Sequence, residues 1–364
     1  MLKKLRSGIT TGTCAAAATK AALFAWRGES RDEVEVTTPQ GIVLSVKVAS
    51  SVGYSNGGQA SVIKDAGDDP DITNGLEITV SVEVVTNQAI IIKAGTGVGI
   101  VTKPGLSVPV GQPAINPGPQ KMIIQAVRDV LNDNLGAIVT VSIPDGETLA
   151  KRTLNPILGV VGGISIIGTT GIVEPMSEDA FKNSLTPQIS VVKAAGFDDI
   201  IFVPGKIGHD IAVKYKLPKE QIVQTSNFIG HMLESAAHFK IKRVLLFGHL
   251  GKLVKVAAGI FHTHNRVADG RLETLAAYMA ANGAPRAAIQ EILNCVTTEA
   301  AIPIVDKYSM NYVYNVLASR ASMRAERYVF GDFKVGTVIV TLAGEILGID
   351  DTAREIGGSL GWSI

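Results

Sequence analysis

Cysteine is scarce in this sequence. Its 364 residues include two cysteines, Cys14 and Cys295, which lie far apart and form no CxxC pair. Both a disulfide framework and a structural zinc site are therefore disfavoured, and we expect no protein-bound metal. Free cysteines are typical of a reducing compartment, so we expect a cytoplasmic protein.

Charge of one sign is also lacking, because 34 basic and 33 acidic residues give a formal net charge of +1. No global field would attract nucleic acid or an anionic membrane, so any anion site must be local. Aromatic residues make up only 5% of the chain, which disfavours a base-stacking surface for nucleic acid. We therefore expect neither nucleic acid nor a membrane as a partner.

Long hydrophobic runs are absent as well. The longest candidate, residues 157–167, is broken by Gly159, Gly162 and Gly163, so it is too short and irregular to span a membrane. The alanine-rich segment near the N-terminus is interrupted by Lys20 and lacks the uniform apolar core of a secretory signal. We expect a soluble protein whose N-terminal segment belongs to the mature chain.

Glycine is plentiful, at 38 residues, and suits ligand sites that are lined by backbone. The length suggests about two domains. The first, residues 1–155, mixes strands and helices and is expected to be an α+β domain. Its expected elements are a helix at 13–26, two strands within 33–48 that turn at Pro39-Gln40-Gly41, strands at 76–86 and 89–94 joined as a hairpin by Asn87-Gln88, a helix at 119–132 and a strand at 137–143.

Residues 156–364 show a different pattern, in which short apolar strands end in glycine or polar residues and lead into helical runs. Strands are expected at 200–203, 222–224 and 243–247, with a closing hairpin within 335–349. This alternation predicts βαβ units and a mostly parallel sheet in an α/β domain. Ligands of such sheets bind at the carboxyl ends of the strands, so the following loops are expected at the edge of a site.

Five segments carry residues suited to binding or chemistry, and the first precedes the alanine-rich helix. It has the sequence SGITTGTC and includes Thr10, Thr11, Gly12 and Thr13. Amides and hydroxyls at a helix start can hold a carboxylate or phosphate. The alternative is an ordinary hydroxyl cap on a packed helix. The segment lacks the lysine of a P-loop, which disfavours nucleoside triphosphates.

The second segment, DAGDDPD, is acidic and contains Asp65, Asp68, Asp69 and Asp71. Such carboxylates could bind a cation, hold the ribose hydroxyls or ammonium of a cofactor, or remove a proton. The spacing does not match an EF-hand. A solvated turn around Asp69-Pro70 is the alternative.

The third and fourth segments are rich in glycine. GTGVGIVTKPGL, residues 95–106, has a spacing that matches the dinucleotide-binding fingerprint poorly, and its Lys103 could contact a carboxylate. LGVVGGISIIGTTGIVEPMS, residues 158–177, provides the hydroxyls of Thr169 and Thr170 and the carboxylate of Glu174. Its glycines, which include Gly162 and Gly163, favour either a ligand against the backbone or a tightly packed crossover.

The fifth segment, residues 248–271, combines a βα junction with a basic cluster. Gly248 and His249 follow a strand and precede Lys252 and Lys255, so amides and cations would lie where an anion binds. Further along, His262, His264 and Arg266 extend the cluster. The histidines lack a third ligand and a metal-binding spacing, so they are expected to hydrogen-bond carboxylates or to move a proton.

Read together, these segments resemble the cobalt-precorrin-5B (C-1)-methyltransferase family, often called CbiD. The matching stretches are SGITTGTCAAAATKAA, DAGDDPDITNG, GTGVGIVTKPGL with GQPAINPGP, NPILGVVGGISIIGTTGIVEPMS and LLFGHLGKLVKVAAGIFHTHNR. They occur in order from Ser7 to Arg266. The resemblance implies an α+β N-terminal domain, residues 1–155, and a Rossmann-like α/β C-terminal domain, residues 156–364.

The resemblance also implies an enzyme that transfers a methyl group from S-adenosylmethionine to C-1 of cobalt-precorrin-5B. The product would be cobalt-precorrin-6A, on the anaerobic route to cobalamin, and the cobalt would belong to the substrate. The macrocycle carries many carboxylates, which need dispersed cations and amides. Association into a homo-oligomer and transient contacts with neighbouring pathway enzymes are left open.

On this interpretation each candidate residue has an expected role. Catalysis is assigned to Asp65, Asp68 and His264. Donor binding is assigned to Asp69, Gly162, Gly163, Thr169, Thr170 and Glu174. Substrate binding is assigned to Thr10, Thr11, Gly12, Thr13, Lys103, Gly248, His249, Lys252, His262 and Arg266.

Two other functions are compatible with the same residues. A tetrapyrrole carrier would bind the macrocycle without altering it, and would have no use for the methyl donor. A nucleotide-dependent transferase or dehydrogenase would use the parallel sheet, and rests on fold analogy alone.

Overall fold

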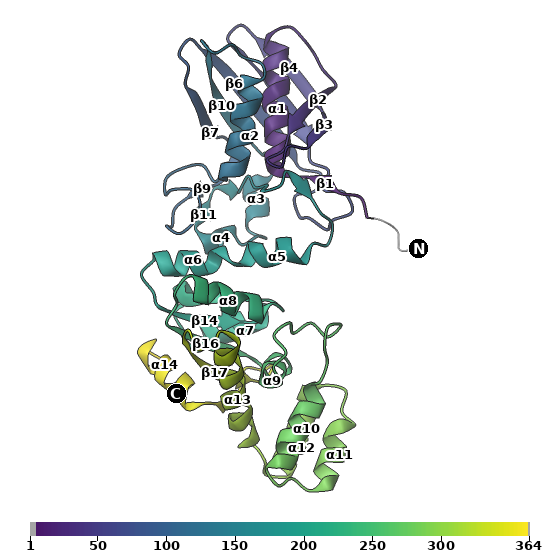
Figure 1. The fold of residues 1–364 in the computed structure, drawn as a ribbon, viewed down its shortest axis with the longest axis vertical. Helices are drawn as coiled ribbons and strands as arrows, with labels where there is room; N and C mark the ends of the chain where they lie inside the picture. The colour runs from purple at the N-terminus through teal and green to yellow at the C-terminus, as the bar shows by residue number, and fades with distance from the viewer. Residues whose placement is uncertain (1–4, 363–364) are drawn as a thin grey trace. The chain divides into compact units, whose positions relative to one another are not determined.

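A computed structural model describes residues 5–362 and divides the chain into two compact units, residues 1–178 and 179–364 (Figure 1). The boundary predicted after residue 155 is too early, because the following residues pair with strands of the first unit. β11 (Val160–Val161) pairs with β9 (Ile100–Val101), and β13 (Ile172–Val173) pairs with β1 (Gly8–Ile9). Residues 156–178 therefore complete the first unit.

The main sheet of the first unit has the strand order β4-β5-β6-β10-β7. Its strands are β4 (Ser50–Tyr54), β5 (Gly57–Ile63), β6 (Glu77–Val85), β10 (Gly136–Ser142) and β7 (Ile90–Ala94). The predicted hairpin between residues 76–86 and 89–94 is wrong, because β10 lies between β6 and β7 and is parallel to β7. The short segment between β6 and β7 has the length of a hairpin turn. No feature of the local sequence indicates that β10, a later strand, lies between them.

Two helices, α1 (Thr11–Trp26) and α2 (Pro117–Arg128), cover this sheet (Figure 1). The alanines of α1 allow a very close approach to the strands. A Cβ atom added to Gly58 would lie 2.2 Å from the carbonyl oxygen of Ala22. The small side chains on both sides therefore set the spacing of this layer.

The remaining elements of the first unit are short. β2 (Glu33–Thr37) and β3 (Val43–Lys47) form the predicted antiparallel pair, and Gly41 has a positive φ of 82° in their turn. β8 (Gly97–Val98) pairs in parallel with β12 (Gly163–Ile164). Two short helices, α3 (Gly146–Ala150) and α4 (Asn155–Leu158), accompany these pairs (Figure 1).

The sheet of the second unit has the order β15-β14-β16-β17-β18. Its strands are β15 (Ile222–Gln224), β14 (Asp199–Val203), β16 (Arg243–His249), β17 (Lys334–Val340) and β18 (Ile346–Ile349). All the strand pairs are parallel except β17 with β18, which is the expected closing hairpin. The mostly parallel sheet predicted from the sequence is therefore present.

Helices surround this second sheet and extend beyond one of its ends (Figure 1). Most of them precede or follow a strand of this sheet along the chain. They are α5 (Glu178–Leu185), α6 (Pro187–Ala194), α7 (Lys206–Lys214), the 3-10 turn η1 (Lys219–Gln221), α8 (Ile229–His238), α9 (Leu250–Ala257), α13 (Val313–Tyr328) and α14 (Asp351–Ser359). Three more form a group of their own: α10 (Arg271–Ala281), α11 (Arg286–Leu293) and α12 (Thr298–Lys307).

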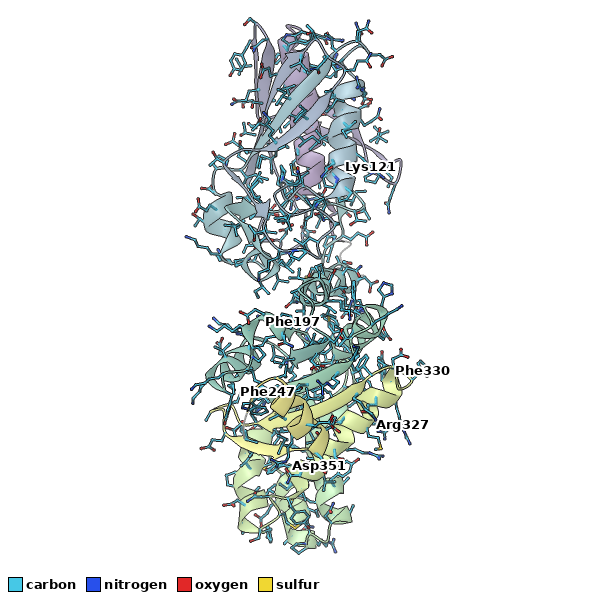
Figure 2. The ribbon with its side chains drawn as sticks, turned by 90° about the vertical axis from the view of Figure 1, so that its left-hand side faces the viewer. Lys121, Phe197, Phe247, Arg327, Phe330 and Asp351 are labelled. Carbon is cyan, nitrogen blue, oxygen red and sulfur yellow. The ribbon has the colours of Figure 1, made fainter. Side chains whose placement is uncertain are left out.

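The core of the second unit is built on strand β16. Its Phe247 is fully buried and meets the rings of Tyr215 and Trp362 edge-on, with centroids 6.0 Å away in both cases. Figure 2 shows Phe247 within the unit, whereas Phe330 projects from its surface. Among residues 5–362, no helix combines the length and apolar character needed to cross a membrane.

Candidate functional site

The start of α1 is occupied by the protein's own backbone. The amide of Gly12 donates to the carbonyl of Ile167 over 3.0 Å, and the hydroxyl of Thr13 donates to the carbonyl of Gly171 over 2.6 Å. Thr10 is the N-cap and accepts from the Thr13 amide. All four predicted residues of this segment are buried: Thr10, Thr11, Gly12 and Thr13. The structure thus shows the hydroxyl cap, and these groups hold the segment 167–171 instead of a free anion.

The acidic segment binds other parts of the first unit. Asp65 forms a two-pronged ion pair with Arg6, at 2.5 and 2.9 Å, and Asp68 accepts from the Arg6 amide at 2.8 Å. Asp69 accepts from the amide of Met176 at 2.8 Å. The Arg6 guanidinium lowers the pKa of Asp65 below its usual value, which makes this carboxylate a weaker base. Sequence reasoning missed Arg6, since nothing local links it to the acidic segment.

The fourth aspartate of this segment belongs to a buried ion pair. Asp71 accepts a 2.6 Å hydrogen bond from Lys64, whose side chain is only 1% exposed. Burial acts to raise the pKa of Asp71, but hydrogen bonds from Lys64 and Thr73 outweigh it and lower the pKa below its usual value. This pair fixes the turn that follows β5.

Most glycines of the segment 158–177 are required by packing. A Cβ atom added to Gly163 would lie 2.1 Å from the carbonyl carbon of Gly97, and one added to Gly168 would lie 2.3 Å from the hydroxyl of Thr10. Gly162 differs, because it has a φ of 85° and open space around an added Cβ. The tightly packed crossover therefore accounts for Gly163 and Gly168, and leaves Gly162 accessible.

Several side chains of the same segment face solvent. Thr169 and Glu174 are exposed, while Thr170 is half-buried and donates its hydroxyl to the carbonyl of Ile172. Large apolar side chains accompany them, with exposed fractions from 53% to 67%: Ile167, Val161 and Met176. The segment thus offers hydroxyl, carboxylate and apolar groups to a ligand.

Lys103 is exposed, and its stem lies over a second glycine of this region. A Cβ atom added to Gly159 would lie 2.4 Å from Cγ of Lys103. The Lys103 ammonium donates to the carbonyl of Ile157 over 3.3 Å. This single long hydrogen bond leaves the cation able to contact a carboxylate.

In the second unit, His249 ends β16 and caps α9. Its Nδ1 accepts from the amide of Gly251 at 3.1 Å, so the proton of the neutral ring is assigned to Nε2. Nε2 donates to Oε1 of Glu299 over 2.7 Å, and the same oxygen accepts from the Leu342 amide at 2.8 Å. Gly248 is buried beside Pro204. Sequence reasoning missed Glu299, which lies about fifty residues away at the start of α12.

The two lysines of α9 differ in their surroundings. Lys255 is fully buried, and its ammonium donates to three oxygens, in Thr263, Asn265 and Ala268, at 2.7 to 3.1 Å. Lys252 is half-buried and contacts the side-chain oxygen of Asn227. Burial, followed by the charge of Lys255, lowers the pKa of Lys252 below its usual value. Lys255 therefore makes most of the hydrogen bonds to the loop, whereas Lys252 adds one long bond of 3.4 Å to the Thr263 carbonyl and retains capacity for a ligand.

The histidines of this loop lie close to each other. The ring of His262 contacts that of Phe228 with centroids 4.8 Å apart and planes tilted by 41°, and its centroid is 6.5 Å from that of His264. His264 is exposed and its Nδ1 accepts from the amide of Arg266 at 3.2 Å. Within the described part of the chain, no three His, Cys, Asp or Glu side chains are placed to hold a metal ion. The structure thus joins Lys252, His262, His264 and Arg266 in one region of the second unit.

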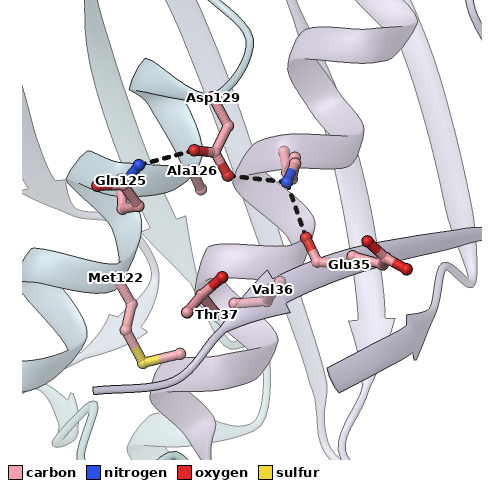
Figure 3. Close-up of a pocket in the computed structure, with 8 residues that line it drawn as sticks. Glu35, Val36, Thr37, Met122, Gln125, Ala126 and Asp129 are labelled. Atoms are coloured by element: carbon pink, nitrogen blue, oxygen red, sulfur yellow. Dashed lines mark hydrogen bonds and ion pairs between the residues drawn. The ribbon is translucent and has the colours of Figure 1, made fainter. Parts of the chain in front are cut away.

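One pocket, in the first unit, involves none of the predicted residues (Figure 3). Lys20 lines it and donates to Asp129 at 2.8 Å and to the carbonyl of Glu35 at 2.9 Å. The hollow has a volume of ≈ 170 Å³, below the roughly 300 Å³ at which ligand pockets usually begin. It is too small for a tetrapyrrole or a nucleoside cofactor.

Comparisons with known proteins follow the same division of the chain. The family model CbiD matches residues 1–175, and the model "CbiD, C-terminal domain" matches residues 262–351. A curated protein of Moorella thermoacetica, named cobalt-precorrin-5B C(1)-methyltransferase, is 50% identical over 366 residues, which cover 100% of both chains. A protein of the same name from Methanocaldococcus jannaschii is 46% identical over 350 residues, or 95% of this chain and 96% of that one.

A solved structure is also similar in sequence. It is described as a cobalamin biosynthesis protein (cbiD) from Archaeoglobus fulgidus, is 30% identical, and covers 72% of this chain and 83% of that chain with a TM-score of 0.40. The full-length identity to the curated relatives confirms the resemblance predicted from the five segments. This chain belongs to the CbiD family.

Proposed function

We propose that this chain is an S-adenosylmethionine-dependent methyltransferase that methylates C-1 of cobalt-precorrin-5B. The product is cobalt-precorrin-6A, on the anaerobic route to cobalamin. The observation that carries the proposal is 50% identity over the full length of a relative with this activity in its name. The cobalt belongs to the substrate.

The chemistry asks mainly for positioning. The methyl group leaves the sulfonium as its bond to sulfur breaks and a new bond to the ring carbon forms, in line and at an approach of roughly 3 Å. The macrocycle's carboxylates need cations that are not already neutralised. Within residues 5–362, Lys103, Lys252 and Arg266 have no carboxylate partner and are our candidates.

Proton transfer is assigned to His264 in preference to the aspartates. His264 is exposed and its Nδ1 accepts an amide hydrogen bond from Arg266, so the neutral ring carries its proton on Nε2 and can donate it there. To accept a proton, the ring has to release the Arg266 amide from Nδ1. Asp65 is neutralised by Arg6 and its pKa is lowered, so it is poorly suited to accept a proton. Asp65 and Asp68 instead position the N-terminal strand.

The methyl donor brings an ammonium, a carboxylate and ribose hydroxyls. The accessible groups of the segment 158–177 suit it: the carboxylate of Glu174, the hydroxyl of Thr169 and the open backbone at Gly162. Thr170 supports the turn through its bond to Ile172, and Gly163 and Asp69 maintain the packing.

The second unit is proposed to be Rossmann-like, which its parallel strand pairs support. We further propose that the enzyme works in the cytoplasm. Its two cysteines form no disulfide, which agrees with a reducing compartment.

Isothermal titration calorimetry with S-adenosylmethionine tests the function directly. An enzyme binds the donor and transfers its methyl group to cobalt-precorrin-5B, which mass spectrometry detects as a gain of one methyl. A tetrapyrrole carrier would bind the macrocycle but not the donor. A nucleotide-dependent enzyme would bind NAD or ATP instead.

A further inference from the structure

Two arginines on α13 are charged, half-buried and unpaired. Within residues 5–362, the Nε atoms of Arg320 and Arg324 are shielded from solvent and have no hydrogen-bond partner. No carboxylate oxygen of those residues lies within 4.0 Å of either guanidinium. The polar contact that Arg320 does make is a 3.8 Å approach of Nη1 to the sulfur of Met323, which is a weak acceptor. A buried cationic donor without an acceptor is costly and calls for an explanation.

Arg324 borders the segment that carries the candidate residues His262 and His264. A Cβ atom added to Gly259 would lie 3.7 Å from Nη1 of Arg324. One turn further along α13, the ring of Tyr328 contacts that of Phe261 with centroids 4.2 Å apart and planes tilted by 36°. Residues at i, i+4 and i+8 share a helix face, so Arg320 lies on this same face. The next arginine, Arg327, lies near the end of the helix (Figure 2).

The end of α9 explains only part of this arrangement. Arg324 lies beside that C-terminus, where carbonyl groups favour a cation. However, two carbonyls in the last turn of α9, those of Val256 and Lys255, already accept from the amides of Gly259 and Ile260. Arg320 lies a further turn away along α13, about 6 Å. The C-terminus of α9 can therefore account for the position of Arg324, but it is too far away to be a partner of Arg320.

We propose that Arg320 and Arg324 form a carboxylate-binding site for the macrocycle, next to the segment 259–264. Two guanidinium groups about one turn apart suit two carboxylates on neighbouring side chains of a polycarboxylate ring. Because each Nε is shielded from solvent, each guanidinium would bind its carboxylate through the two Nη atoms. The proposed function supplies the identity of the ligand. Arg320 and Arg324 would then place the ring's edge beside His262 and His264.

The test measures binding of a stable analogue, the cobalt complex of an octacarboxylate porphyrin, by absorbance titration. The variants are Arg320→Gln, Arg324→Gln and the double variant. Arg354→Gln is the matched control, because Arg354 is exposed on α14 and belongs to no predicted site. A cobalt porphyrin with neutral side chains serves as the control ligand.

The proposal predicts that each single variant weakens binding of the octacarboxylate at least about tenfold, as expected for a lost charged hydrogen bond. The control variant and the neutral porphyrin should change less than twofold. Affinity for the octacarboxylate that stays within twofold in the folded double variant would overturn the proposal. If the glutamine variants fail to fold, Arg320→Met and Arg324→Met replace them, because methionine fills the half-buried position without a charge, and unchanged binding in both would likewise overturn it.

The outcome separates this site from the proposed function. A chain that binds the octacarboxylate through the arginine pair, but does not bind S-adenosylmethionine, would refute the methyltransferase and leave the carboxylate site standing. Binding of the donor with no effect of the arginine variants on the porphyrin would retain the enzyme and refute the site.

Discussion

His249 and Glu299 are joined by a 2.7 Å hydrogen bond from Nε2 to Oε1, although about fifty residues separate them in the chain. The same oxygen accepts from the amide of Leu342, so one carboxylate links the end of β16, the start of α12 and the residues after β17. This contact fixes the loops at the carboxyl edge of the parallel sheet. Its contribution to the free energy of unfolding can be measured.

Replacing Glu299 by alanine leaves the amide of Leu342 and the ring of His249 without their acceptor. We expect a loss of about 1–3 kcal/mol in the free energy of unfolding, measured by urea denaturation. Glu299→Gln retains an acceptor oxygen and should lose less. A glutamine variant as unstable as the alanine variant would argue against the hydrogen bonds as the source.

Asp71→Asn should strongly destabilise the first unit, because Lys64 would remain buried without its counter-charge. We expect a loss of about 3–5 kcal/mol at neutral pH. The folded pKa of Asp71 is below its usual value, so its stabilisation is present above about pH 4 and lost as the pH falls through the folded pKa. Urea denaturation at pH 7 and pH 3 measures this difference. The exposed Asp133→Asn is the control, and an equal loss at both pH values would contradict the ion-pair explanation.

Two neighbouring glycines should respond differently to alanine. Gly163→Ala pushes a methyl group against the backbone of Gly97 and is expected to destabilise the protein by about 3 kcal/mol or more. Gly162→Ala makes no close contact, and only the positive φ of this position disfavours alanine, which lowers the free energy of unfolding by about 1 kcal/mol. Thermal unfolding of both variants measures the contrast. Equal losses would show that close packing does not distinguish the two positions.

Substitutions of the two lysines of α9 should have different effects, one on stability and the other on ligand binding. Lys255→Met removes the donor to three oxygens of the loop and should speed amide hydrogen exchange in residues 263–268, besides lowering stability by about 3 kcal/mol. Lys252→Met should change exchange little and weaken binding of the octacarboxylate porphyrin. The reverse pattern would refute the roles assigned to the two side chains.

The two thiols should differ in reactivity. Burial raises the pKa of Cys14 to about 12, so almost no thiolate exists at pH 8. Cys295 is only half-buried, and although burial also raises its pKa, reagents can reach it. A disulfide reagent should therefore label Cys295 alone in the native protein and both thiols after denaturation. Rapid native labelling in a Cys295→Ser variant would contradict the burial of Cys14.

The sequence predicted the elements whose signals are local. The helix ending at Trp26, the ladder around Gly41 and the parallel strands of the second unit follow from periodicity and turn residues. It could not predict that β10 inserts between β6 and β7, because strand order depends on pairing between distant segments. The glycines of residues 158–177 were equally ambiguous, since a glycine required by backbone contact and one required by a ligand look the same in a sequence.

The candidate site was predictable in part. The basic residues near His262 were found because they cluster in the chain, and the structure keeps them together. Partners that come from elsewhere, such as Arg6 for Asp65 and Glu299 for His249, could not be found without the fold. For the threonines at the start of α1, the sequence could not decide between an anion site and a hydroxyl cap, because the segment that occupies them lies about 160 residues further along.

The pairing of Gly8–Ile9 with Ile172–Val173 has a consequence for synthesis of the protein. During translation, β1 cannot pair with β13 until nearly all of the first unit has been synthesised. A nascent chain that stops at residue 155 lacks this partner and the strands β11, β12 and β13. Completion of the N-terminal unit is thus a late event, set by the arrival of its last strand.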